Sequence, residues 1–301
     1  MRKVVKFFVF VFLIQGVCFP QTFEELKKRI TSSRDLERRQ AVYEVAHSTL
    51  SFAPQLLELA LESDDIFTKR MAVSGLGNFI TLKSFEILHR CLRDELAVIR
   101  ADAIVALANF PKDIIQDEIL KMLDDTNFIV IKESLKVIGK LKIMKARTKL
   151  LKLLDEKSEI IRTATLNAIA ELQIKEAFEK IKEIFEKENS LSVKKSALFA
   201  MSKIDIEKAY PILRENLENK DIKIALYSAF VLAQNMDTSG KDIVKKALKN
   251  PDPQIRIEAA KVLLYYDDDE SKTLLKGLLN DPDSSVRNFV KNNFKTEEEE
   301  K

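Results

Sequence analysis

The chain has 301 residues, of which 46% are apolar and 32% are charged, and this composition excludes an intrinsically disordered protein. Only six glycines and seven prolines are present, so there is little material for phosphate-binding loops or tight hairpins, and we expect an all-α protein. The formal net charge of +3 comes from Arg2, Lys3 and Lys6, which leaves the rest of the chain neutral. A neutral surface is unsuited to the nucleic-acid backbone, so no nucleic-acid partner is expected.

The first 18 residues have the order of a secretory signal peptide. Basic residues precede an apolar run from Phe7 to Ile14, and the small residues Gly16 and Cys18 precede a cleavage site after Cys18. The run is shorter than the roughly 20 residues of a membrane-spanning helix, so we expect it to be removed after export. Residues 1–18 are therefore predicted to be a signal peptide, and the mature protein to reside in the periplasm or cell envelope.

Cys18 also allows a bacterial lipoprotein, in which the first cysteine of the mature chain is acylated. The residues before it, Gln15, Gly16 and Val17, differ from the Leu, small residue, and Gly or Ala that are typical of such signals. We therefore expect membrane contact only if Cys18 is lipidated. Without Cys18, the single remaining cysteine is Cys91, and no intramolecular disulfide forms.

A period of 31 residues runs through the rest of the chain and decides its architecture. The anchor column takes one residue from each repeat: Glu37, Thr68, Ile99, Val130, Ile161, Val193, Ile224, Ile255 and Val286. Every step is 31 residues except the step of 32 between Ile161 and Val193. The sequence therefore predicts nine repeats.

Two further columns support this register. The basic column, one residue after the anchor, consists of Arg38, Lys69, Arg100, Ile131, Arg162, Lys194, Ala225, Arg256 and Arg287. The small column, four residues after the anchor, consists of Ala41, Ala72, Ala103, Ser134, Thr165, Ala197, Ser228, Ala259 and Val290. Small residues allow two helices to approach to the roughly 8–10 Å of ordinary helix packing.

Each repeat is predicted to be a helical hairpin. Aliphatic pairs with i, i+4 spacing, such as Leu150 and Leu154, mark one face of the first helix. Residues with a side-chain oxygen, suited to capping the second helix, stand three positions before the anchor in seven repeats: Asp65, Asn127, Ser158, Ser190, Asp221, Asp252 and Asp283. One hairpin cannot bury both of its faces, so neighbouring repeats supply the core and an α-solenoid results.

Two segments, Asn250–Leu263 (NPDPQIRIEAAKVL) and Asp281–Arg287 (DPDSSVR), resemble HEAT repeats, particularly the short class first noticed in phycobilisome lyases. The resemblance extends over about residues 22 to 296. It implies an all-α armadillo/HEAT-like superhelix of about nine 31-residue hairpins, which we assign to residues 19–296. Most HEAT arrays are binding scaffolds and some are enzymes, so the resemblance leaves the function open.

Candidate catalytic chemistry is sparse. The only histidines, His47 and His89, are isolated, whereas the hydroxylases of HEAT architecture use repeated His-Glu pairs as iron ligands. We therefore predict no catalytic residues, no metal and no cofactor. The basic column is expected to pair with acids of neighbouring turns, such as Asp94, Asp125 or Asp281. The acidic residues 267–270 are predicted to form a solvated loop, and residues 297–301 an acidic disordered tail.

The second helices of repeats six to eight carry apolar residues where early repeats carry charges. These candidate binding residues are Phe199, Leu226, Tyr227, Phe230, Ile257 and Tyr265. They either form an exposed patch for a protein or peptide partner or lie buried between repeats. The predicted function is a non-enzymatic protein-interaction scaffold in the bacterial cell envelope, and the alternative is a lyase-like HEAT enzyme or enzyme subunit.

Overall fold

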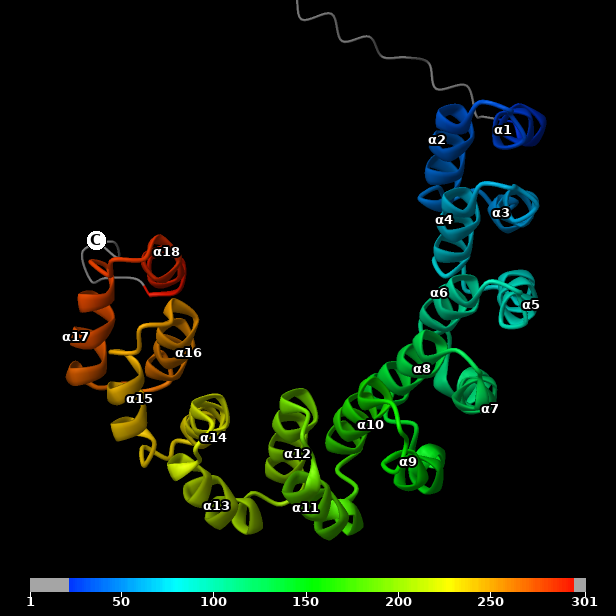
Figure 1. The fold of residues 1–301 in the computed structure, drawn as a ribbon. Coiled ribbons are helices and arrows are strands. Elements are labelled where there is room, and N and C mark those ends of the chain that lie inside the picture. Colours follow the sequence, from blue (N-terminus) through cyan, green and yellow to red (C-terminus); the bar gives the residue numbers. More distant parts are fainter. Residues whose placement is uncertain (1–21, 295–301) are drawn as a thin grey trace, which may run out of the picture. The chain divides into compact units, whose positions relative to one another are not determined.

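The computed structural model describes residues 22–294, and this part of the chain consists of 18 α-helices and four short 3₁₀ helices, without a β-strand (Figure 1). The helices follow one another as nine antiparallel hairpins, each with a first and a second helix, which confirms the predicted α-solenoid. The predicted signal peptide (residues 1–18), Cys18 and the predicted acidic tail (residues 297–301) lie outside the described residues.

The helices divide into two compact units, and the first unit ends at Phe110. Its helices are α1 (Phe23–Ile30), α2 (Asp35–Ala46), α3 (Ala53–Ala60), α4 (Ile66–Leu76), α5 (Leu82–Cys91) and α6 (Ala97–Leu107). The second helices α2, α4 and α6 pack against one another in sequence and form one row. The first helices α1, α3 and α5 lie together along one side of that row (Figure 1).

The second unit begins at Pro111. Its α-helices are α7 (Lys112–Lys121), α8 (Phe128–Lys140), α9 (Arg147–Leu153), α10 (Glu159–Leu172), α11 (Phe178–Lys187), α12 (Leu191–Ile204), α13 (Ile206–Glu215), α14 (Ile222–Gln234), α15 (Lys241–Ala247), α16 (Pro253–Leu263), α17 (Asp269–Leu278) and α18 (Ser284–Asn293). Its 3₁₀ helices are η1 (Met122–Asp124), η2 (Met144–Ala146), η3 (Lys175–Ala177) and η4 (Asn216–Glu218). Within this unit the even-numbered second helices form the inner row and the first helices the outer row (Figure 1).

The predicted register holds in every repeat. Each second helix begins two residues before its anchor residue, as α6 does at Ala97 before Ile99. Five of the seven predicted capping side chains accept a hydrogen bond from a backbone N–H of the first turn: Asp65, Asn127, Asp221, Asp252 and Asp283. Ser158 and Ser190 hold the same position without such a bond. The 31-residue spacing therefore determines where the second helices start.

The small column lies in the buried core of the repeats. All nine of its residues, from Ala41 to Val290, are 0% exposed. Neighbouring second helices approach closely at Gly75 on α4, where an added Cβ atom would lie 2.6 Å from the Cβ atom of Ala46 on α2. A larger side chain at these points would force the helices apart, because protein interiors are too densely packed to absorb it.

Candidate functional site

The arginines of the basic column bind the turn that precedes their own helix. In α16, Arg256 Nη1 donates hydrogen bonds to the carbonyl oxygens of Asn250 (2.7 Å) and Pro251 (3.0 Å). Arg38, Arg100, Arg162 and Arg287 likewise donate to the carbonyl six residues earlier, at 2.6–2.8 Å. These arginines therefore hold the angle between the two helices of a hairpin, and their guanidinium groups are occupied within the protein.

Arg256 and Arg162 also reach the following repeat. Arg256 makes two hydrogen bonds, of 2.7 and 2.8 Å, to the carboxylate of Asp281, and both residues are only 8% exposed. Arg162 donates two hydrogen bonds to Glu188, both to its Oε2 atom. The predicted pairing with Asp281 is thus confirmed. Arg100 donates to the backbone carbonyl of Asp94. A fork-shaped guanidinium suits this double contact to a carboxylate.

The hydrogen bonds from Arg256 hold the pKa of Asp281 below the usual range for aspartate. A carboxylate with a depressed folded-state pKa stabilises the fold at pH values above its unfolded pKa, which is about 4. That contribution is lost as the pH falls through the lower folded-state pKa. The Arg256–Asp281 pair is therefore fully stabilising at neutral pH.

A recurring turn residue was missed in the sequence. Five residues before the anchor, a side-chain oxygen accepts the backbone N–H of the residue two positions later, at 2.8–3.2 Å, in eight repeats. These residues are Ser32, Ser63, Asp94, Asp125, Glu188, Asn219, Asn250 and Asp281. The signal was visible, because this position is polar in every repeat and stands two residues before the capping position.

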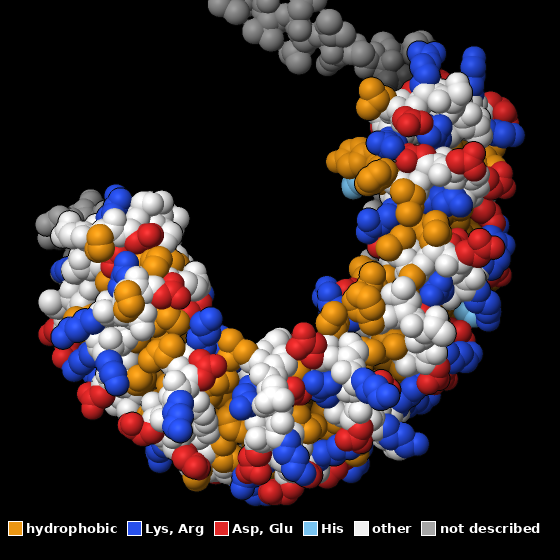
Figure 2. Space-filling view, in the orientation of Figure 1, with side chains coloured by type: hydrophobic (Ala, Val, Ile, Leu, Met, Phe, Trp, Pro, Cys, Tyr) orange, Lys and Arg blue, Asp and Glu red, His pale blue; other side chains and the backbone are white. Residues whose placement is uncertain are grey.

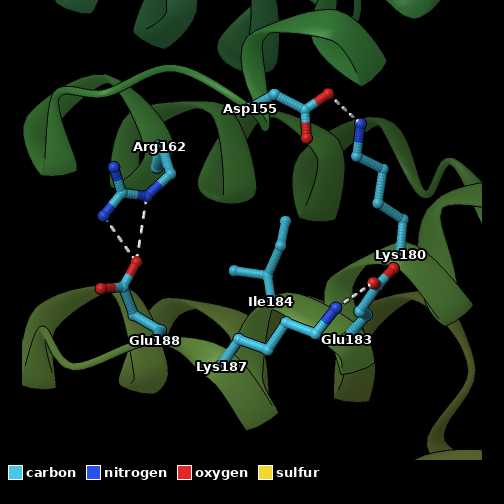
Figure 3. Close-up of a pocket in the computed structure, with 7 residues that line it drawn as sticks. All are labelled: Asp155, Arg162, Lys180, Glu183, Ile184, Lys187 and Glu188. Atoms are coloured by element: carbon cyan, nitrogen blue, oxygen red, sulfur yellow. Dashed lines mark hydrogen bonds and ion pairs between the residues drawn. The ribbon is translucent and has the colours of Figure 1, made fainter.

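A charged pocket lies beside α10 and α11, where the repeat length changes to 32 residues (Figure 3). Its three basic and three acidic side chains form the pairs Arg162–Glu188 (2.6 Å), Lys180–Asp155 (2.5 Å) and Lys187–Glu183 (2.5 Å). Because each of these charges has a protein partner, the pocket is better explained as a junction between repeats five and six than as a ligand site.

The structure divides the six predicted binding residues into two groups. Leu226 and Ile257 are 2% and 9% exposed and belong to the core shared by α14 to α18, although we expected them to face outward. They stand two residues after the anchor, a position that turns toward the adjacent second helix. Arg70 in the same position of α4, for example, pairs with Asp102 of α6. Phe199, Tyr227 and Phe230 are half-buried, and Tyr265 is 48% exposed.

Three of these residues form an aromatic cluster, which we define as Tyr227, Phe230 and Tyr265. The ring centroids of Tyr227 and Phe230 are 5.9 Å apart, and those of Phe230 and Tyr265 are 5.3 Å apart at an interplanar angle of 89°. Gln234 Nε2 donates to Tyr265 Oη at 3.4 Å. Burial raises the pKa of the Tyr227 hydroxyl. The cluster joins α14 to the residues just after α16 and is preorganised by edge-to-face contacts.

Lysines that the sequence analysis did not single out lie against aromatic rings of the same row of helices. The Nζ atom of Lys195 is 5.3 Å from the ring centroid of Tyr227, and that of Lys203 is 5.5 Å from the centroid of Phe199. Such cation–π contacts contribute about 0.5–1 kcal/mol at exposed sites. Figure 2 shows apolar side chains exposed among charged ones over the second unit.

Other reactive features are few in the described residues. Cys91 is buried, and burial raises the pKa of its thiol to about 11, so this group stays protonated at neutral pH. No group of three or more His, Cys, Asp or Glu side chains between residues 22 and 294 is placed to hold a metal ion. No helix in this range combines the length and the apolar composition needed to cross a membrane.

Residues 210–290, from α13 to α18, match the family model of HEAT repeats. No curated protein matches this sequence. Among solved structures, the chain is similar to a full-length AP-3 complex in an intermediate open conformation, with 19% identity and a TM-score of 0.57 over 88% of this chain and 55% of that one. It is also similar to Kap95p bound to RanGDP, with 10% identity and a TM-score of 0.57 over 91% and 44% of the two chains.

A third similar structure is the phycocyanin lyase complex of CpcE and CpcF from a Nostoc species, with 19% identity and a TM-score of 0.47 over 74% of this chain and 92% of that one. The likenesses with a TM-score of 0.57 show the fold of the chain, which is an α-solenoid of the armadillo/HEAT type. Residues 210–290 of this solenoid match HEAT repeats.

Replacing Arg256 by alanine tests the structural role of the basic column. We expect Arg256→Ala to lower the free energy of unfolding by about 2–3 kcal/mol, because it leaves the buried carboxylate of Asp281 without its partner. Chemical denaturation at neutral pH measures this change. The control Lys187→Ala removes an exposed pair with Glu183 and should be indistinguishable from wild type. An Arg256→Ala protein as stable as wild type would contradict this role.

Proposed function

We propose that the chain is a non-enzymatic scaffold that binds a protein or peptide in the bacterial cell envelope. The observation that carries this proposal is the aromatic cluster, which is held rigidly between two repeats and still has Tyr265 half exposed. Rigid aromatic side chains lose little conformational entropy on binding and are enriched among residues that dominate interfaces. Their position on the second-helix row supports a role in contacting a partner.

The repeat architecture supports the same proposal. Stacked helical hairpins create an extended surface, and solenoids use such surfaces for binding. The arginines described above are engaged in turns and between repeats, so they serve the fold. The surface of the second-helix row therefore offers contact area and aromatic anchors in preference to reactive groups.

The proposed location depends on residues 1–18. Their order of basic residues, apolar run and small residues is that of an export signal. The proposal therefore places the mature chain outside the cytoplasm, with the protein or peptide partner in the same compartment.

Tyr265 is the most direct test of the binding surface. We expect Tyr265→Ala to reduce capture of the partner from envelope extracts by at least about tenfold, because exposed aromatic anchors dominate interface energies. Its thermal unfolding should remain close to that of wild type, since the ring is 48% exposed. Phe230→Ala is the wrong variant for this purpose, because Phe230 packs against the core and its loss should lower stability.

The matched control is Leu82→Ala, which removes an apolar side chain that is 74% exposed on the first helix α5. It should leave capture unchanged. Equal loss of capture in both variants would refute the assignment of binding to the aromatic cluster. A chromophore or metal that remains with the folded, purified protein would instead favour a lyase-like enzyme or enzyme subunit.

Export is tested by fractionating cells that produce the full chain and by sequencing the N-terminus of the mature protein. We expect a shortened protein in the periplasmic or envelope fraction, with cleavage near Cys18. Acylated Cys18 would show membrane anchorage. A full-length protein confined to the cytoplasm would contradict the proposed location.

A further inference from the structure

We propose that the second-helix row of the second unit binds an acidic amphipathic helix. The apolar side of that helix would contact the aromatic cluster, and its carboxylates would contact the lysines around the cluster. This inference rests on the proposed function and specifies the chemistry of the partner.

The second-helix row of the second unit carries a local excess of positive charge. On α8 to α16 the side chains two, three, six and ten residues after the anchor are exposed or half-buried, except for the buried Leu226 and Ile257. Six lysines and three acids occupy these positions: Lys132, Lys136, Lys140, Lys195, Lys203 and Lys261, against Glu133, Glu171 and Glu258. Because the chain after residue 18 is neutral as a whole, this excess belongs to one face and favours an acidic partner.

The lysines nearest the aromatic residues are available to a partner. Lys195 and Lys203 lie over Tyr227 and Phe199, and within residues 22–294 neither forms an ion pair with a carboxylate. A lysine in this position lays its alkyl stem on the ring and keeps its ammonium group in water. The ammonium groups are thus positioned to receive the carboxylates of a partner whose apolar residues cover the rings.

A similar combination of apolar side chains and lysines lies between α8 and α10. A groove between α8 and α10 has Leu135, Ala164 and Ala168 along its floor. The exposed lysines Lys132, Lys136 and Lys140, spaced four residues apart on α8, line its rim. An apolar floor with a lysine rim therefore occurs on both sides of α12, which suits one ligand that extends across several repeats.

A helix fits the spacing of this row. Neighbouring second helices pack at about 8–10 Å, and seven residues of an α-helix advance about 10.5 Å. Apolar side chains repeated about every seven residues would meet one repeat after another. Acidic residues beside that apolar stripe would then face the lysines.

A lipid surface is a poorer occupant of this face. Tyr227 and Phe230 are half-buried, and within the second unit α12, α14 and α16 belong to its inner row (Figure 1). An apolar face that binds a bilayer is buried about 5–10 Å into the boundary between headgroups and acyl chains.

Two fluorescent model helices test the inference with the full mature protein. Both carry the same stripe of leucine and phenylalanine, and the flanking residues are glutamate in one peptide and lysine in the other. We expect the glutamate peptide to bind at least about tenfold more tightly by fluorescence anisotropy, and its affinity to fall as salt is raised.

Charge reversal on the protein locates the contact. The double variant Lys195→Glu and Lys203→Glu should weaken binding of the glutamate peptide at least about tenfold and strengthen binding of the lysine peptide. The control variant Lys246→Glu and Lys276→Glu makes the same change of net charge on the first helices α15 and α17, at exposed sites. It should leave both affinities within about twofold of wild type.

The inference is overturned if the lysine peptide binds as tightly as the glutamate peptide, if neither binds, or if both double variants have the same effect. Preferential binding to anionic phospholipid vesicles or to an oligothymidine also overturns it.

A different experimental result would contradict the proposed function. If Tyr265→Ala loses an envelope partner while neither peptide binds, the scaffold stands and the acidic helix is wrong. If the glutamate peptide binds but no envelope partner is captured, the acidic-helix inference stands and the proposed scaffold function is wrong.

Discussion

The close approach of neighbouring second helices is the constraint on which the rest of the structure depends. The small column is 0% exposed in all nine repeats, and at Gly75 there is no room even for a methyl group next to Ala46. Large residues are excluded from this column, so they occupy the positions that face the adjacent helix or the open side of the row. Leu226 and Ile257 face the adjacent helix, and Tyr227 and Tyr265 lie toward the open side of the row. The aromatic cluster is thus a consequence of how the repeats stack.

The two kinds of basic side chain have separate tasks. Arginines of the basic column bind turn carbonyls and carboxylates of the next repeat, as Arg256 does with Asn250 and Asp281. Lysines such as Lys195 and Lys203 remain on the surface beside aromatic rings. The planar guanidinium suits the directed internal contacts, and the flexible ammonium suits a solvated binding surface. Electrostatics therefore contributes to the fold through one column and, in the proposed function, to recognition through another set of residues.

The fold was predictable from the sequence because its determinants repeat every 31 residues. Capping residues such as Asp65 and Asp252, together with the small column, fix the start and the packing face of each second helix. The proposed binding surface was less predictable, because it depends on how far each helix rotates about its axis. That rotation buries Leu226 and Ile257 and brings Tyr265 against Phe230, which is 35 residues earlier in the sequence. The placement of Lys195 over Tyr227 also depends on contacts between repeats, which periodicity does not specify.

The most direct measurement of the central constraint compares alanine substitutions at two helical glycines. Gly75→Ala should lower the free energy of unfolding by about 1–3 kcal/mol, because the new methyl group overlaps Ala46 of the neighbouring second helix. Gly277→Ala on α17 has no atom within 4 Å of the new methyl group and should raise stability by up to about 1 kcal/mol through helix propensity. Chemical denaturation of both variants gives the two values. A Gly75→Ala protein as stable as Gly277→Ala would contradict the account, because α2 and α4 would then not approach as closely as the contact between Gly75 and Ala46 requires.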